Sequence, residues 1–160
     1  MLKRHFVFAI TAVAMLAGCA APSKPLTVAD TLAARPQLST LNGLIVQAGL
    51  ADTLKGTGLF TLFAPTNEAF AKVPAKTLDA LAKDPAQLKA VLTYHLVAGK
   101  LMTADVKNTT LPTVQGANVA LSRAGDFVTV EEALVVTPNI SASNGVVHIV
   151  DSVLIPPAKR

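Results

Sequence analysis

Apolar residues recur at a helical period in the first half of the chain. Those between Leu38 and Ala48 lie mostly three or four positions apart, and Gly49 follows them as a helix stop signal. A second stripe follows Asp84, which can cap a helix, and Pro85, which suits the first helical position. This stripe consists of Leu88, Val91, Leu92, His95 and Leu96. The pattern predicts two amphipathic helices, each with one face turned towards a core.

The segments between these two stripes are predicted to form one strand and two short helices. Residues 59–65, LFTLFAP, are typical of a short strand that ends at Pro65. Thr66 is a good N-cap for a short helix in TNEAFAKV, and PAKTLDALAKD predicts another helix directly after it. The first half is therefore predicted to be mainly helical, with one strand embedded in it.

The second half has a different pattern. Residues 110–157 are rich in Val and Thr, and turn-forming residues interrupt them at Gly116, Gly125, Asn139 and Asn144-Gly145. Several short strands in an antiparallel meander fit this spacing, and Asn144-Gly145 is expected to supply the positive backbone angles of a tight turn. Because helices come first and strands later, the chain is predicted to be an α+β domain.

The N-terminal residues 1–18 have the pattern of an export signal. Lys3 and Arg4 precede an apolar run, residues 6–17, that is too short to span a bilayer. The run ends in Leu-Ala-Gly followed by Cys19, which resembles a bacterial lipoprotein signal and predicts lipid attachment at Cys19. Residues 19–25 would then be a tether, 26–157 the folded domain and 158–160 a tail. Ala20, where inner-membrane retention favours Asp, points to the outer membrane.

Removal of this signal limits the chemistry that can be expected. The chain has 14 basic and 10 acidic residues; without Lys3 and Arg4, 12 basic residues remain and the net charge falls to +2. The charges are scattered and aromatic residues make up 4% of the chain, which argues against nucleic-acid binding. Cys19 is the single cysteine, so neither a disulfide within the chain nor a thiolate metal site is expected.

His95 and His148 are the histidines that remain after the signal. Neither has another His or a Cys within four residues, whereas metal sites usually need three or four ligands at short spacings. The chain contains no Gly-x-Ser-x-Gly elbow, glycine-rich phosphate loop or dinucleotide fingerprint. We therefore expect no catalytic residue, metal or cofactor, although a triad or two-histidine site assembled in space is compatible with the sequence.

The surroundings of His148 favour a structural role. A strand from Val146 to Ile155 would carry mainly apolar residues on both faces, so it should be covered on both sides. His148 would share its face with Val146, Val150 and Leu154. A ring buried there would be neutral, with hydrogen-bond partners for both nitrogens.

Three segments together resemble the fasciclin-like domain family. They are GLFTLFAPTNEAFAKVP at residues 58–74, LTYHLVAGKL at residues 92–101 and SASNGVVHIVDSVLIPP at residues 141–157. They occur in the family's order and at about its spacing, and the resemblance covers roughly residues 26–157. It implies an N-terminal helical layer packed on an antiparallel wedge or sandwich of about seven strands.

The resemblance also implies roles for individual residues. The positions it makes structural are Thr66, Asn67, Phe70, Asn144, Gly145, His148 and Asp151. In animal members, receptor contact is tied to a Tyr-His segment with its apolar neighbours and to an Asp-Ile pair. Here these correspond to Tyr94, His95 and Leu96, and to Asn139 and Ile140, which form the candidate interaction surface. Asn139 lacks the carboxylate that a metal-bridged contact would need.

Family members are mostly extracellular or membrane-anchored and act in adhesion. The resemblance therefore implies a non-enzymatic adhesion or protein-interaction module, anchored in the bacterial envelope, with an unknown protein or cell-surface partner. The alternative is a carrier for an apolar small molecule held between the helices and the sheet. A sizeable apolar pocket would favour the carrier, and a filled core with an exposed apolar patch would favour the contact module.

Overall fold

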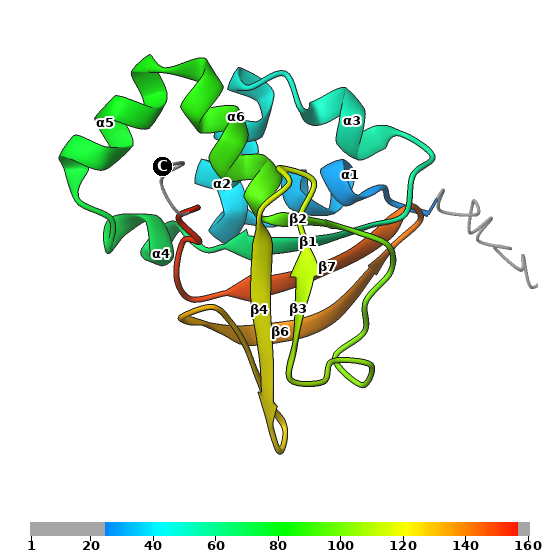
Figure 1. Cartoon of the computed structure of the whole chain (residues 1–160). Helices are drawn as coiled ribbons and strands as arrows, with labels where there is room; N and C mark the ends of the chain where they lie inside the picture. The colour runs from blue at the N-terminus through cyan, green and yellow to red at the C-terminus, as the bar shows by residue number, and fades with distance from the viewer. Residues whose placement is uncertain (1–24, 157–160) are drawn as a thin grey trace, which may run out of the picture.

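The computed structural model describes residues 25–156. In this part of the chain, helices fill most of the first half and strands most of the second (Figure 1). The helices are α1 (Val28–Ala33), the 3-10 helix η1 (Pro36–Leu38), α2 (Ser39–Gln47), α3 (Ala51–Lys55), α4 (Asn67–Ala71), α5 (Ala75–Lys83) and α6 (Pro85–Tyr94). The strands are β1 (Phe60–Pro65), β2 (Leu96–Ala98), β3 (Thr109–Pro112), β4 (Asn118–Ala124), β5 (Phe127–Val130), β6 (Ala133–Ala142) and β7 (Gly145–Val150).

Local sequence signals set several helix boundaries. The Thr66 hydroxyl accepts a hydrogen bond from the Ala69 N–H at 3.2 Å and so caps α4. Asp84 caps α6 through backbone N–H groups of its first turn, and Pro85 is its first residue. The stripe predicted as one helix spans two elements, because α6 ends at Tyr94 and Leu96 begins β2.

The seven strands form one curled sheet in the order β2-β1-β7-β6-β5-β4-β3. Its two edge strands approach each other: Val97 forms a bridge with Thr113, and the Val114 N–H donates to the Leu96 carbonyl at 2.8 Å. The α+β fold with a helical layer and seven strands is confirmed. One pair departs from the antiparallel expectation, because β1 and β7 are parallel.

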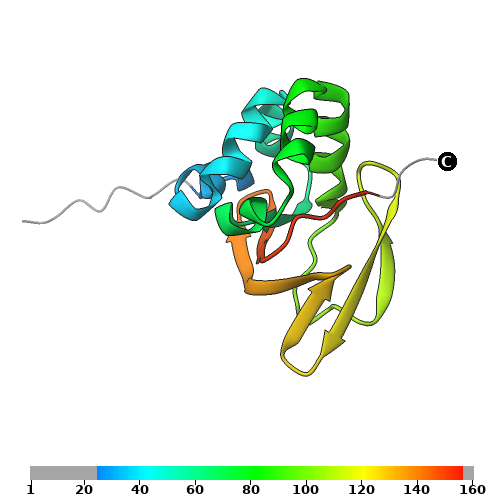
Figure 2. The same ribbon diagram turned by 90° about the vertical axis from the view of Figure 1, so that its left-hand side faces the viewer.

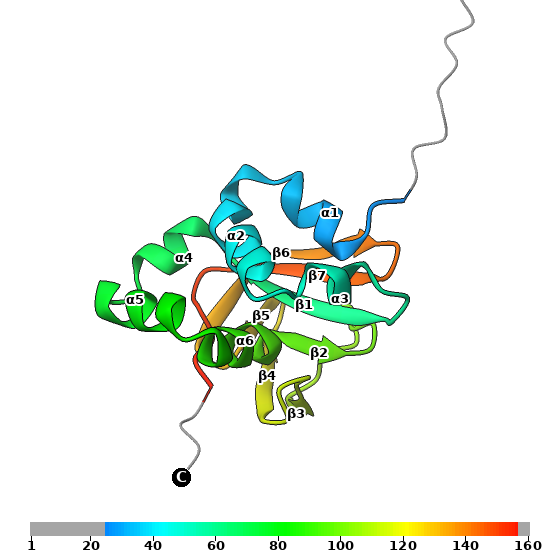
Figure 3. The ribbon, with the colours of Figure 1, turned by 90° about the horizontal axis from the view of Figure 1, so that it is seen from above.

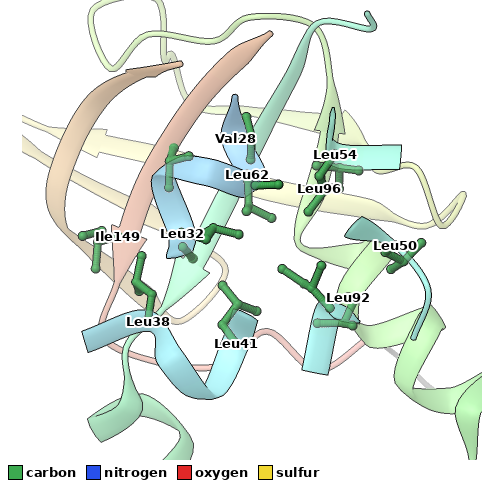
Figure 4. Close-up of a cluster of buried hydrophobic side chains, with 14 of the residues drawn as sticks. Val28, Leu32, Leu38, Leu41, Leu50, Leu54, Leu62, Leu92, Leu96 and Ile149 are labelled. Carbon is green, nitrogen blue, oxygen red and sulfur yellow. The ribbon is translucent and has the colours of Figure 1, made fainter. Parts of the chain in front are cut away.

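Strands β1 and β7 separate two apolar cores. Helices α1, α2 and α3 lie over one face of these strands (Figure 3), and their residues fill the helix-side core (Figure 4). That core includes Val28, Leu32, Leu38, Leu41, Leu50, Leu54, Leu62, Leu92, Leu96 and Ile149. The other face closes the barrel core, which consists of Phe63, Tyr94, Val97, Val106, Val119, Leu121, Val128, Val130, Ala133, Val150 and Leu154. Every residue of β7 is buried, because the strand is covered on both sides.

The last strand is shorter than predicted. It ends at Val150 rather than Ile155. Asp151 exchanges two hydrogen bonds with Leu134: its N–H donates to the Leu134 carbonyl, and its carboxylate accepts from the Leu134 N–H at 2.9 Å. The chain then turns away from the sheet, so that the Leu154 N–H meets a histidine ring instead of a neighbouring strand.

The predicted turn before the last strand is present, at Ser143 and Asn144 between β6 and β7, but the positive backbone angles predicted for Asn144-Gly145 were wrong. Neither residue has a positive φ; among the described residues the glycines that do are Gly49, Gly99, Gly116 and Gly125. Glycine is needed at position 145 for a different reason. A Cβ there would overlap the carbonyl oxygen of Phe60, with which Gly145 is paired across the parallel strands. Gly145 therefore permits the close approach of β1 and β7.

Candidate functional site

His148 is a buried component of the sheet, with 1% of its surface exposed. Its Nδ1 accepts a hydrogen bond from the Asn139 N–H at 3.1 Å, and its Nε2 donates to the Leu101 carbonyl at 2.8 Å. The Phe63 ring stacks on it, with centroids 5.6 Å apart. This pattern requires the neutral tautomer with a proton on Nε2. Burial lowers the pKa of His148, and the bond to Leu101 opposes that shift.

His95 is held in the opposite way, at the C-terminal end of α6. Its Nδ1 donates to the Val91 carbonyl at 2.8 Å, and its Nε2 accepts from the Leu154 N–H at 3.0 Å. The ring is therefore neutral, with its proton on Nδ1. Burial lowers its pKa to about 4, against the opposing effect of the bond to Val91.

These bonds determine what the two histidines can do chemically. All four ring nitrogens are engaged by backbone groups, so none has a lone pair or proton directed at a ligand. Within residues 25–156, no three His, Cys, Asp or Glu side chains gather closely enough to hold a metal ion. The arrangement of His95 and His148 favours structural roles over catalysis or metal binding.

The structure corrects the candidate interaction surface. Tyr94, His95 and Leu96 are buried, with 2%, 1% and 3% exposed, so their side chains are not presented to a partner. The contact role was carried over from the family resemblance, whereas the apolar stripe that includes His95 and Leu96 had already indicated a face turned towards the core. The end of α6 and the start of β2 instead turn these residues inward: Tyr94 joins the barrel core and Leu96 joins the helix-side core.

The second part of that candidate surface is also occupied by internal contacts. Asn139 adopts φ 59°, and its side chain is bonded twice to Thr103: Oδ1 accepts from the Thr103 N–H at 2.9 Å, and Nδ2 donates to its hydroxyl at 2.7 Å. Ile140 is half-buried against the helix-side core. Asn139 is exposed but holds the loop before β3 against β6, so its side chain already has a structural task.

Asn144 joins three segments that are remote in sequence. Its Oδ1 accepts from the Val28 N–H at 2.8 Å, and its Nδ2 donates to the carbonyls of Leu54 at 2.7 Å and Gly56 at 2.8 Å. The side chain is buried, so these bonds satisfy it fully. Sequence reasoning placed Asn144 in a turn and missed this role. No local pattern could have revealed it, since the partners lie 88 to 116 residues away.

Asn67, Phe70 and Asp151 also serve the fold. The Asn67 amide donates to the Pro36 carbonyl and accepts from the Thr40 N–H, which fixes the start of α2. Phe70 packs in the helix-side core. Asp151 ties the end of β7 to β6, as described above. These residues join elements by hydrogen bonds and packing; Asn67 also lines a shallow surface hollow of about 360 Å³ beside Gln37 and Val136.

An open groove of about 550 Å³ lies between α5, α6 and the C-terminal segment 153–156. Figure 2 shows that segment, in red, passing beneath the green helices and beside the turn between β3 and β4. The lining is apolar apart from Thr77, Gln87 and Gln115. Sequence reasoning missed this groove; the four-residue spacing of Val73, Thr77 and Leu81 is the pattern that could have indicated it.

The interior and the surface differ in how their apolar residues are packed. The space enclosed by the helix-side core residues is only about 10 Å³, which is room for no more than one water. At the surface, Phe127 is 66% exposed next to the turn of the β4–β5 hairpin, which projects from the body of the domain (Figure 1). The helix-side core is therefore filled, while apolar surface remains on the projecting hairpin and in the groove.

Comparisons with known proteins agree on one family. The model of the fasciclin domain matches residues 36–156. The immunogenic protein MPB70 of Mycobacterium bovis is 42% identical over 136 residues, which cover 82% of this chain and 69% of that protein. The cell surface glycolipoprotein MPB83 of the same species is 39% identical over 137 residues, covering 82% of this chain and 61% of that protein.

A solved structure supports the same fold. A FAS1 domain pair from the insect cell adhesion molecule Fasciclin I superimposes with a TM-score of 0.68 at 20% identity. The match covers 82% of this chain and 51% of the insect chain, so this chain spans about half the length of that pair. Within residues 25–156, none of the helices has the length and apolar character needed to cross a membrane.

Proposed function

The chain belongs to the fasciclin domain family, and we propose that it is a non-enzymatic contact module held at the bacterial envelope by a lipid on Cys19. One observation carries the proposal: 82% of the chain aligns at 39% identity with a cell surface glycolipoprotein. The filled core supports it as well, because such a domain offers its outer surface rather than an inner chamber to a partner.

Cys19 lies outside the described residues, and its sequence context supports the anchor. It follows Leu-Ala-Gly at the end of a charged and then apolar segment. Cys19→Ser should abolish labelling of the protein by radioactive palmitate and move it from the detergent phase to the aqueous phase. Ala21→Ser, which keeps the Leu-Ala-Gly-Cys sequence, is the matched control and should label normally. A Cys19→Ser protein that is still labelled would contradict the anchor and leave the contact role untouched. Ala20 supports placement in the outer membrane, which membrane fractionation would test.

The contact surface has to lie away from the buried Tyr-His segment. We assign it to the projecting β4–β5 hairpin, where Phe127 is the most exposed of the large apolar side chains among the described residues. Aromatic side chains are enriched in protein interfaces because they bury a large area at a low cost in conformational entropy. A projecting hairpin can reach a partner without rearrangement of the domain.

Adhesion can be measured with beads that carry the domain from residue 20 onwards. We expect them to bind cells of the source organism or surfaces coated with matrix proteins, and we expect Phe127→Ser to reduce that binding. Val46→Ser is the matched control, because Val46 is 62% exposed on α2 and away from the hairpin. Binding no greater than that of albumin-coated beads would contradict the contact role. Equal loss in both variants would contradict the assignment to the hairpin.

A further inference from the structure

We propose that the groove between α5, α6 and the C-terminal segment binds a neutral, mainly apolar small molecule that carries one hydrogen-bond acceptor oxygen. Its volume of about 550 Å³ falls within the range of small-molecule sites, about 300 to 1,000 Å³. This proposal does not depend on the contact role, because the hairpin and the groove use different elements.

The groove exists because α5 and α6 do not close on each other. On α5 no residue is buried, although Thr77 and Leu81 lie four positions apart on the side that faces the groove, and Val73, just before the helix, lines it with them. An amphipathic helix normally buries its apolar side. On α6 the facing positions include Ala86 and Ala90, which lie one turn apart and whose short side chains leave space between the helices.

The opposite wall is held in a fixed position. Val153 and Ile155 line the groove, and Leu154 between them is buried in the barrel core. The Leu154 N–H is bonded to Nε2 of His95 at 3.0 Å, with both groups buried. The wall is therefore anchored at its centre, so the groove is formed before any ligand enters and less ordering is required on binding.

The lining determines the charge of the ligand. None of the eleven lining residues is Asp, Glu, Lys, Arg or His. A carboxylate or phosphate seated in the groove would lose hydration without gaining an opposite charge, which disfavours charged lipids. An uncharged, largely apolar molecule meets the lining without that cost.

Gln115 determines where the polar atom of the ligand would sit. Its Oε1 accepts from the Ala117 N–H at 3.1 Å, and this bond orients the side chain. The amide NH₂ group is then the part of Gln115 that can bond a ligand. The Gln87 amide is less available, because one of its N–H groups already donates to Asp84 at 2.9 Å. Because an NH₂ group only donates, the fitting ligand atom is a carbonyl or hydroxyl oxygen.

Nile red is a suitable probe, since it is neutral and apolar, carries one carbonyl oxygen and brightens in apolar sites. The full chain should bind one Nile red molecule saturably. Ala90→Leu should weaken binding about tenfold or more by filling the groove. Ala80→Leu adds the same atoms at an exposed α5 position outside the lining and should bind as wild type does. Thermal melting would verify that both variants fold.

Two further measurements test the ligand chemistry. Dodecanol should displace the probe about tenfold more strongly than dodecanoate at neutral pH, because the two differ only at the polar end. Gln115→Glu keeps the acceptor oxygen for Ala117 but removes the donor, so it should weaken probe binding.

Four results would overturn the proposal. They are absence of saturable binding, equal binding by the Ala90→Leu and Ala80→Leu variants, equal displacement by dodecanol and dodecanoate, and a stoichiometry of one probe per two chains. The last result would assign the groove to an interface between copies. If Nile red failed to bind while Ala90→Leu, and not Ala80→Leu, reduced bead adhesion, the groove would belong to a protein partner instead.

Discussion

Side chains are covered in the sheet interior and left partly open in the α5–α6 groove. In the interior, His95, His148 and Asn144 are buried and fully bonded, and within residues 25–156 no buried side-chain nitrogen or oxygen lacks a partner. In the groove, Thr77 and Leu81 of α5 line an open space, and no residue of that helix is buried. Residues that look distinctive in the sequence thus serve the fold, whereas the space for a ligand lies among ordinary Ala, Val and Leu residues.

Removing the most highly connected interior side chain should have the largest effect on stability. Asn144→Ala leaves a buried N–H and two carbonyls without partners, so we expect a loss of about 4 kcal/mol or more in the free energy of unfolding. Urea denaturation measures it. Asn108→Ala is the control: Asn108 is exposed and accepts one backbone bond, so its loss should stay near 1 kcal/mol. Similar losses in both variants would contradict the role of Asn144.

His148→Ala should cost somewhat less, roughly 2 to 4 kcal/mol, because it opens a cavity beside Phe63 and leaves two backbone groups unbonded. His148→Gln can retain one of those bonds and should lose less. Chemical denaturation of the two variants beside wild type gives both values. A change below about 0.5 kcal/mol for His148→Ala would show that the ring behaves as an exposed residue.

Acid should weaken the interior by a smaller amount. The unfolded chain protonates His95 below a pKa of about 6.5, whereas the folded protein does so only near its lowered pKa of about 4. Between these values the unfolded state binds more protons, so stability falls as the pH falls. At pH 5 the loss from His95 should be roughly 2 kcal/mol relative to pH 7.5, and it levels off below pH 4.

His148, whose pKa is lowered by burial, acts in the same direction. The free energy of unfolding, measured at several pH values between 7.5 and 4, tests the sign. His95→Gln removes one of the titrating rings and should flatten part of the decline. A stability that is constant across this range would mean that neither ring is protected from protonation.

A substitution in the groove should have the smallest effect on the free energy of unfolding. Leu81→Ser shortens a half-exposed side chain on a helix with no buried residue, and we expect a loss within about 0.5 kcal/mol. The same variant should bind Nile red more weakly. A loss above about 2 kcal/mol would place Leu81 in a core rather than beside an open site.

The sequence predicted most of the fold because the relevant signals are local. The α2 stripe, the Thr66 and Asp84 caps and the burial of His148 all follow from residues within one or two turns or one strand. The parallel β1–β7 pair and the contacts of Asn144 could not be predicted in this way, because they join segments that no periodicity links.

The candidate site was less predictable for a related reason. A stripe of apolar residues shows that a helix has an apolar face, but it does not show which elements will cover that face. Leu88 and Leu92 on α6 were covered and Leu81 on α5 was not, although all three belong to helices with apolar residues at helical spacing. Burial depends on neighbours supplied from elsewhere in the chain, such as the turn at Asp151 that brings Leu154 to His95.

The parallel pairing of β1 with β7 also determines the order in which the domain can be completed. Residues 60–62 can pair with residues 96–98 as soon as β2 is made, but the parallel partners of residues 60–65 come only at residues 145–150. A chain that emerges from the ribosome N-terminus first therefore makes its helical half long before the strand that seals it, and such remote pairing is slow to form. Until β7 arrives, both cores lack their shared wall. Nascent chains that end before residue 145 are expected to remain loose and protease-sensitive. We expect the whole domain to become ordered in a single late step, when β7 pairs with β1.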